Sequence, residues 1–165
     1  MRNIDSDMHT DPWLRTLTMT QRVAWYGMIT QIADDQGRFR RDYVDFRYKI
    51  FFGDQIPDSE IGAILENFSK AGKIVVYRDS NPNNQDEYIQ IINWWKYQGS
   101  ASYMTQSKYP APPGWTDKWC YTGKKRKPVK SDNWDSGICG FIPVQMPIIT
   151  PVVSPVVTPV KGGVV

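Results

Sequence analysis

Residues 18–33 read TMTQRVAWYGMITQIA, and this stretch decides the fold. It opens with a capping box, because Thr18 and Gln21 are spaced so that each side chain can bond to the other's free backbone N–H. Over residues 23–33 only Thr30 and Gln31 are polar, so the predicted helix is apolar on nearly every side. Such a helix is surrounded by protein rather than lying on a surface. We therefore expect the central core helix here.

Two neighbouring features extend this prediction. Gly27 lies inside the helix, where glycine costs about 1 kcal/mol relative to alanine, so another element is expected to pack close against it. Upstream, Asp11 is an N-cap candidate and Pro12 suits a first helical position, which predicts a short helical turn.

A short strand and a second helix are predicted next. Residues 34–37 form a turn, and residues 38–40 (RFR) alternate as a strand with Phe39 inward and both arginines outward. Asp42 caps a helix that runs to about Phe52, and Gly53 ends it. Its expected inward residues fall at helical spacing: Tyr43, Phe46, Ile50 and Phe51.

A third helix and a hairpin follow. The helix begins near Asp58 and ends at Gly72, with an apolar face made of Ile61, Ile64, Leu65 and Phe68. Residues 74–77 (IVVY) and 88–91 (YIQI) are two strands joined by a polar loop, which predicts an antiparallel hairpin.

The tandem tryptophans in IINWWKYQ (residues 91–98) can be read in two ways. If the strand continues, Trp94 and Trp95 point to opposite faces, so that one joins the core and the other stays partly exposed. The exposed ring either stacks on a base beside Lys96 or packs against the proline-rich segment SKYPAPPGW (residues 107–115). We favour packing, with that segment extended across the sheet.

Charge and composition change along the chain of 165 residues. Residues 1–95 carry eleven Lys/Arg against fourteen Asp/Glu, whereas residues 96–130 carry eight basic side chains against the single acid Asp117. Such a block suits phosphate binding, although a solvated linker has the same composition. After Lys130 proline recurs every four residues from Pro143, which predicts an extended, disordered tail.

The chain also resembles a family. The segments DPWLRTL, ADDQGRF, LENFSKAGKI, INWWKYQ and SKYPAP, in this order, are similar to the N-terminal domains of phage replisome-organiser and related primosomal proteins. The resemblance covers about residues 5–115 and implies a winged helix-turn-helix fold with a role in phage or prophage DNA replication. Many members carry a further domain that recruits replication partners.

The sequence as a whole therefore predicts an α+β protein. A winged helix-turn-helix domain (three-helix core, short strand and β-hairpin wing) is expected over residues 1–115. A basic linker follows over residues 116–130, and a disordered Pro/Val-rich tail over residues 131–165.

Candidate DNA contacts fall into three groups. The outward side of the third helix presents Asn67 for adenine and Lys70 for phosphate or guanine, beside Glu60 and Glu66, which repel phosphate. A second group surrounds the short strand and second helix: Arg38, Arg40, Arg41, Arg47 and Lys49. The third is the basic block, chiefly Lys96, Lys124, Lys125, Arg126 and Lys127. For each group a merely solvated surface is the competing interpretation.

Other functional classes find little support in the sequence. It has no Gly-rich phosphate loop, no HExxH and no nucleophile elbow, so we expect no enzyme and no cofactor. One histidine and two cysteines cannot assemble an ordinary four-ligand zinc site, and Asp34–Asp35 suits a turn better than a metal. The N-terminus lacks a signal-like apolar stretch and no apolar span of membrane length is present, so the protein is expected to be cytoplasmic.

The function predicted from these observations is duplex DNA binding at replication initiation, at an origin-like site, with host or phage replication proteins as further partners. Two alternatives remain open. A winged helix can instead dock proteins, as the acidic third helix would favour, or it can act as a transcriptional repressor.

Overall fold

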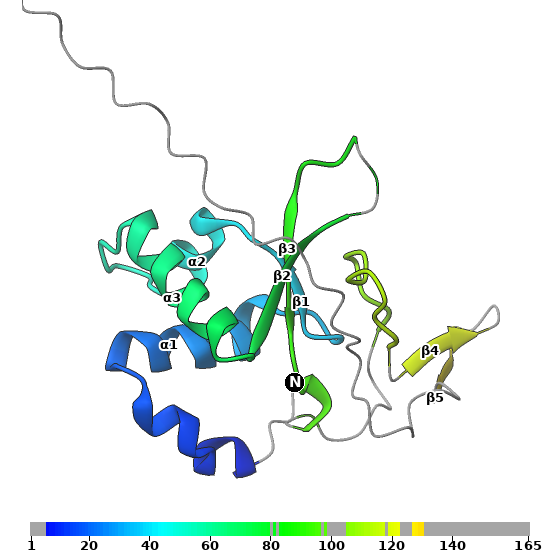
Figure 1. Cartoon of the computed structure of the whole chain (residues 1–165), viewed down its shortest axis with the longest axis horizontal. Helices are drawn as coiled ribbons and strands as arrows, with labels where there is room; N and C mark the ends of the chain where they lie inside the picture. Colours follow the sequence, from blue (N-terminus) through cyan, green and yellow to red (C-terminus); the bar gives the residue numbers. More distant parts are fainter. Residues whose placement is uncertain are drawn as a thin grey trace, which may run out of the picture.

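The described residues contain a small α+β domain of three α-helices and a three-stranded antiparallel sheet, as the sequence predicted. The computed structural model describes residues 6–79, 81, 83–96, 98, 105–117, 119–122 and 127–130. In Figure 1 the helices lie together on one side of the sheet, and a small separate hairpin lies on the other side. The helical side holds the main core.

The N-terminal part consists of two 3-10 helices, Ser6–Thr10 and Pro12–Thr16, and helix α1, Met19–Gly27. Both predicted caps are confirmed: the Asp11 side chain accepts from the Trp13 N–H, and Thr18 and Gln21 form the reciprocal capping box. A single π-helical segment, Met28–Ile32, continues α1. Ala24, Trp25, Gly27, Met28 and Ile29 are buried, but Val23 is exposed, so protein surrounds this helix less completely than predicted.

Helices α2 (Tyr43–Lys49) and α3 (Asp58–Lys70) follow the short strand. Asp42 caps α2 by accepting from two backbone N–H groups, as predicted. The helix ends at Lys49, earlier than expected, because both Ile50 and Phe51 direct their N–H groups to the Phe46 carbonyl and the chain then turns. The four predicted inward residues of α3 are all buried.

The sheet has the order β1–β3–β2, with β1 at Arg38–Arg40, β2 at Ile74–Arg78 and β3 at Glu87–Ile91. Both pairings are antiparallel, and β2 with β3 forms the predicted hairpin. Alternation along the strands gives two faces. The inner face, toward the helices, carries Phe39, Ile74, Ile89 and Ile91.

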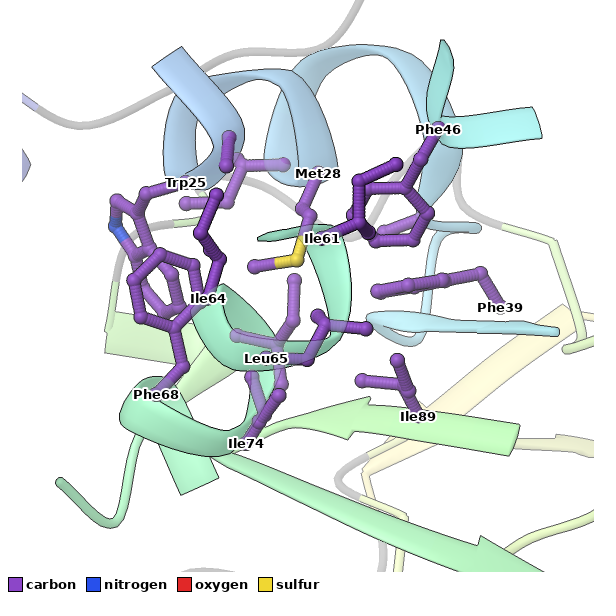
Figure 2. Close-up of a cluster of buried hydrophobic side chains, with 14 of the residues drawn as sticks. Trp25, Met28, Phe39, Phe46, Ile61, Ile64, Leu65, Phe68, Ile74 and Ile89 are labelled. Atoms are coloured by element: carbon purple, nitrogen blue, oxygen red, sulfur yellow. The ribbon is translucent and has the colours of Figure 1, made fainter. Parts of the chain in front are cut away.

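Aromatic and branched side chains from all these elements fill the core (Figure 2). Trp13, Trp25 and Phe68 meet edge to face, with ring centroids 4.9 to 5.5 Å apart. Phe39 on β1 packs against Phe46 on α2, with centroids 5.9 Å apart. The core therefore ties α1 to α3 at one end and the sheet to α2 at the other.

The close approach predicted at Gly27 is present. A Cβ atom at this position would lie 2.5 Å from Ile50 Cγ2, so the segment after α2 packs directly on the helix backbone. Only glycine leaves room for this contact.

The prediction for the two tryptophans was wrong. Trp94 and Trp95 lie in a 3-10 helix, Trp94–Lys96, and both are buried, at 1% and 8% exposure. The strand ends at Ile91, and Asn93 adopts a left-handed conformation with φ 57°, so strand alternation no longer applies. The Trp94 indole N–H donates to the Asp35 carbonyl.

Residues 105–117, here called the strap, cover the outer face of the sheet. Tyr77 and Tyr88 form a second small core with Val75, and Tyr109 of the strap packs against it. The Tyr77 hydroxyl donates to the Pro110 carbonyl at 2.6 Å. This confirms the prediction that the proline-rich segment lies across the sheet.

Two carboxylates in the turn before β1 anchor the strap. Asp34 accepts from the backbone N–H groups of Gln36 and Arg38, which is the predicted turn role, and also from the Ser107 hydroxyl. Asp35 accepts from the Thr105 N–H and hydroxyl, both at 2.8 Å.

Within the stretch predicted to be a linker, β4 (Trp119–Thr122) pairs with β5 (Lys127–Lys130) in an antiparallel hairpin that the sequence analysis did not anticipate. The predicted Pro/Val-rich tail lies outside the described residues.

Candidate nucleic-acid interface

The outward side of α3 has the predicted composition, since Glu60, Ala63, Glu66, Asn67 and Lys70 are all exposed. Lys70 Nζ lies 2.7 Å from Glu66 Oε1, one helical turn away. The hydrogen bond from Lys70 lowers the pKa of Glu66, so the carboxylate stays charged and offsets the ammonium group. Among the described residues Asn67 has no polar side-chain partner and is available to a base edge.

Arg38 contradicts the sequence prediction. It was expected to point outward as part of an anion-binding surface, but its side chain is only 2% exposed. Its guanidinium group pairs with Asp117 of the strap, and its Nε donates to Gln90 Oε1 at 2.7 Å. Strand alternation directs Arg38 away from the main core, as predicted. The strap covers this outer face of β1, so Arg38 is buried between the sheet and the strap. A phosphate cannot reach it.

Arg40 and Arg41 lie at the edge of the sheet, each beside a carboxylate. Arg40 Nη2 donates to Asp42, and this hydrogen bond is the main reason that the pKa of Asp42 is lowered. Arg41 Nη1 lies 2.7 Å from Glu87 Oε2, and its other nitrogen donates to the Tyr43 hydroxyl.

The two cations of α2 are paired in the same way. Arg47 forms an ion pair with Asp58 at the start of α3. Lys49 Nζ lies 2.8 Å from Asp45 Oδ2, one turn earlier on the helix. These pairs are at the surface, where they exchange partners at small cost.

The six predicted cations around β1, α2 and α3 thus each have a carboxylate partner. The structure brings Arg40 and Arg41 together at the sheet edge and Arg47 next to α3, but these described cations do not form a surface of uncompensated positive charge. A phosphate would have to displace a carboxylate at each position, which weakens the electrostatic contribution to affinity.

Two cations without such partners were not among the residues predicted from sequence. Arg15 and Arg22 make no ion pair with a described residue, and Arg22 donates to the carbonyls of Leu14 and Arg15. A signal was present, because residues 12–33 contain no Asp or Glu at all. Arg78 on β2 was also missed, although it shares Glu87 with Arg41.

The basic block is only partly described. Lys124, Lys125 and Arg126 lie outside the described residues, and for Lys96 and Lys127 only the backbone is described. The two strands that flank residues 123–126 pair with each other, with Thr122 opposite Lys127.

Other site types are not seen in the described residues. Their His, Cys, Asp and Glu side chains form no group of three or more that could hold a metal ion. None of the helices described here has the length and apolar character required to cross a bilayer.

Comparisons of the chain with protein-family models, curated proteins and solved structures found no match.

Proposed function

We propose that this chain is a winged helix-turn-helix protein that binds duplex DNA during initiation of phage or prophage replication. The observation that carries the proposal is the order α1–β1–α2–α3–β2–β3 with the sheet order β1–β3–β2. In this arrangement α2 and α3 are the helix-turn-helix pair, and the β2–β3 hairpin is the wing. The sequence resemblance to replisome-organiser domains points to the same fold and supplies the replication role.

The folded domain would contact the bases, and the basic block would contact most of the phosphates. The exposed side of α3 would offer Asn67 to an adenine edge, and Arg78 of the hairpin would lie beside the duplex. These groups give register and modest discrimination. Because the six predicted cations around β1, α2 and α3 are already paired, most of the phosphate contacts fall to residues 124–127, the sequence KKRK.

The direct test is fluorescence anisotropy of the full-length protein with a labelled duplex. We expect binding that weakens steeply between about 50 and 200 mM salt, since several phosphates would be neutralised. Undetectable binding at low salt, or equal affinity at both concentrations, would refute duplex binding.

The replication role needs a separate measurement. Footprinting on the source genome should protect an origin-like site, and a helicase or helicase-loader gene beside the coding sequence would support this role. A footprint confined to the operator next to the protein's own gene would instead identify a transcriptional repressor.

A protein-interaction module is the second candidate, and a specific observation favours it. The paired cations of α2 and α3, with Glu60 and Glu66 exposed, leave little net attraction for DNA on this side of the domain. If the full-length chain fails the anisotropy test, this candidate takes precedence.

A further inference from the structure

The exposed large apolar side chains of the described residues gather on one face. Phe52 is 78% exposed, Met19 73% and Tyr48 71%. Together with Val23 and Val44, they line two open hollows formed by α1, α2 and residues 50–57. We call this surface the α1–α2 apolar face.

The two hollows adjoin. The first has a volume of about 350 Å³ and the second of about 310 Å³. Phe51 and Asp54 line both, so the buried Phe51 ring forms their shared floor. Each volume lies near the lower end of the range of ligand sites and accommodates one or two side chains.

The charge on this face has one sign. Asp54 and Glu60 both line the hollows, and neither makes an ion pair with any described residue. The cation among the lining residues, Arg47, is held by Asp58. The face is therefore apolar with a negative rim.

This combination restricts what can cover the face. Single exposed apolar residues are ordinary, whereas a gathered set marks an interaction surface. An anionic membrane would be repelled by Asp54 and Glu60. A two-fold pair of identical copies would bring the same acidic rims together, and the described residues that line the hollows include no unpaired cation to match them.

We propose that the α1–α2 apolar face binds a short segment of another protein, which carries two apolar anchors, one for each hollow, next to lysine or arginine. Tyr48 and Phe52 meet edge to face, with their ring centroids 6.0 Å apart, and supply the aromatic area typical of binding hot spots. The basic residues of the segment pair with Asp54 and Glu60. This function goes beyond DNA binding and is measured without DNA.

The test starts from a random peptide library selected on the full-length protein. The selected peptides should share two apolar positions and at least one adjacent Lys or Arg. The strongest binder, labelled with a fluorophore, is then the probe for titrations with variants of the protein. A selection that enriches no peptide for this face, or peptides that lack basic residues, would overturn the proposal.

The apolar arm compares Phe52→Ala and Val23→Ala with Asn67→Ala, an exposed α3 variant outside both hollows. Each of the first two should weaken peptide binding at least tenfold, whereas the control should match the parent. Because all three side chains are exposed, unchanged thermal unfolding shows that the fold is intact. Equal affinity for all three proteins would contradict the assignment of the face.

The charge arm compares the double variant Asp54→Asn, Glu60→Gln with Glu66→Gln. The double variant should bind the peptide severalfold more weakly and show a flatter salt dependence. Asp54 and Glu60 line the hollows and face the peptide's cations, whereas Glu66 does not line them. A double variant with the parent's affinity and salt dependence would show that charge does not select the partner.

Two further measurements test whether a second copy of the protein, or the protein's own C-terminal tail, covers the face. Sedimentation should give the same oligomeric state for the parent and for Phe52→Ala, and a dimer lost in the variant would show a second copy on the face. A full-length chain with serine at Ile148, Ile149, Val152 and Val153 should bind the peptide as the parent does. Tighter binding would identify the chain's own tail as the occupant and refute the proposal.

Discussion

The contribution of Arg38 to stability depends on the strap, which buries its charged side chain. Its guanidinium group is buried between Gln90 and Asp117, and the Asp117 side chain is partly exposed. Removing one partner of a fully buried pair costs about 3–5 kcal/mol. Because Asp117 can be rehydrated, we expect Arg38→Met to lower the free energy of unfolding by about 2–3 kcal/mol.

Urea denaturation measures this change, with Arg40→Ala as the control. Arg40 is half-exposed and paired at the surface, so its loss should cost less than about 1 kcal/mol. Equal costs for the two variants would contradict the buried pair.

Tyr77 predicts a pH dependence in the alkaline range. Burial beneath the strap raises the pKa of its hydroxyl well above the ordinary value near 10, since the phenolate would be desolvated. Below the unfolded-state pKa both states are protonated and the group has no effect. Above it, the unfolded state loses the proton first, so stability falls as pH rises.

The measurement is the free energy of unfolding between about pH 9 and pH 11 for the parent and Tyr77→Phe. The variant loses the hydrogen bond to Pro110 but should show a smaller decline with pH. Parallel curves would mean that Tyr77 does not titrate as a buried group.

At the scale of elements, α1 and α3 are joined through their aromatic contact. Trp25 and Phe68 are both buried, and each touches Trp13 edge to face. Replacing either by alanine leaves a large cavity, so Trp25→Ala or Phe68→Ala should cost about 3–5 kcal/mol. Thermal melts measure the loss, and an unchanged melting temperature would mean that these rings do not form the core.

Two helix glycines have opposite predicted effects. Gly27→Ala would place a methyl group against Ile50, so overpacking should cost about 1–3 kcal/mol. Gly62→Ala in α3 meets only the Tyr43 hydroxyl at 3.3 Å, and the gain in helix propensity, about 1 kcal/mol, should make it neutral or stabilising. Denaturant curves give the free energy of unfolding of both variants. A destabilised Gly62→Ala together with an unaffected Gly27→Ala would contradict both predictions.

The elements that local rules control were predicted from sequence. The capping box at Thr18, the apolar face of α3 and the β2–β3 hairpin each depend on residues close together in the chain. Two of the misses have a common cause. Arg38 and the tandem tryptophans are placed by contacts with distant segments, 79 residues away for Arg38 with Asp117 and 59 for Trp94 with Asp35.

The candidate site was predicted less well than the fold. Composition located the arginines around β1 and α2, but it could not show that each has a carboxylate within reach. Arg47 with Asp58 and Arg41 with Glu87 are pairs between different elements, which only the folded chain brings together. The exposed side of α3 was identified because helical spacing alone determines it.

For the molecule as a whole, the proposal of DNA binding assigns base recognition to the folded domain and most of the affinity to the basic block. The domain presents Asn67 on a helix where Lys70 is paired with Glu66, whereas residues 124–127 are four consecutive basic residues in the sequence. The folded domain would then select the DNA site, and residues 124–127 would supply most of the contacts to its phosphates.

The central claim is therefore best tested by the salt dependence of duplex binding. The measurement compares the parent with a variant in which Lys124, Lys125, Arg126 and Lys127 are alanine, and with the control Asn67→Ala, Lys70→Ala. On a plot of log affinity against log salt, the quadruple variant should have a slope flatter by about 3 to 4 units and still prefer the specific site. The control should lose about 1–3 kcal/mol of discrimination and no more than about one unit of slope. A quadruple variant that binds as tightly as the parent, with the same slope, would contradict the account and assign the phosphate contacts to the folded domain.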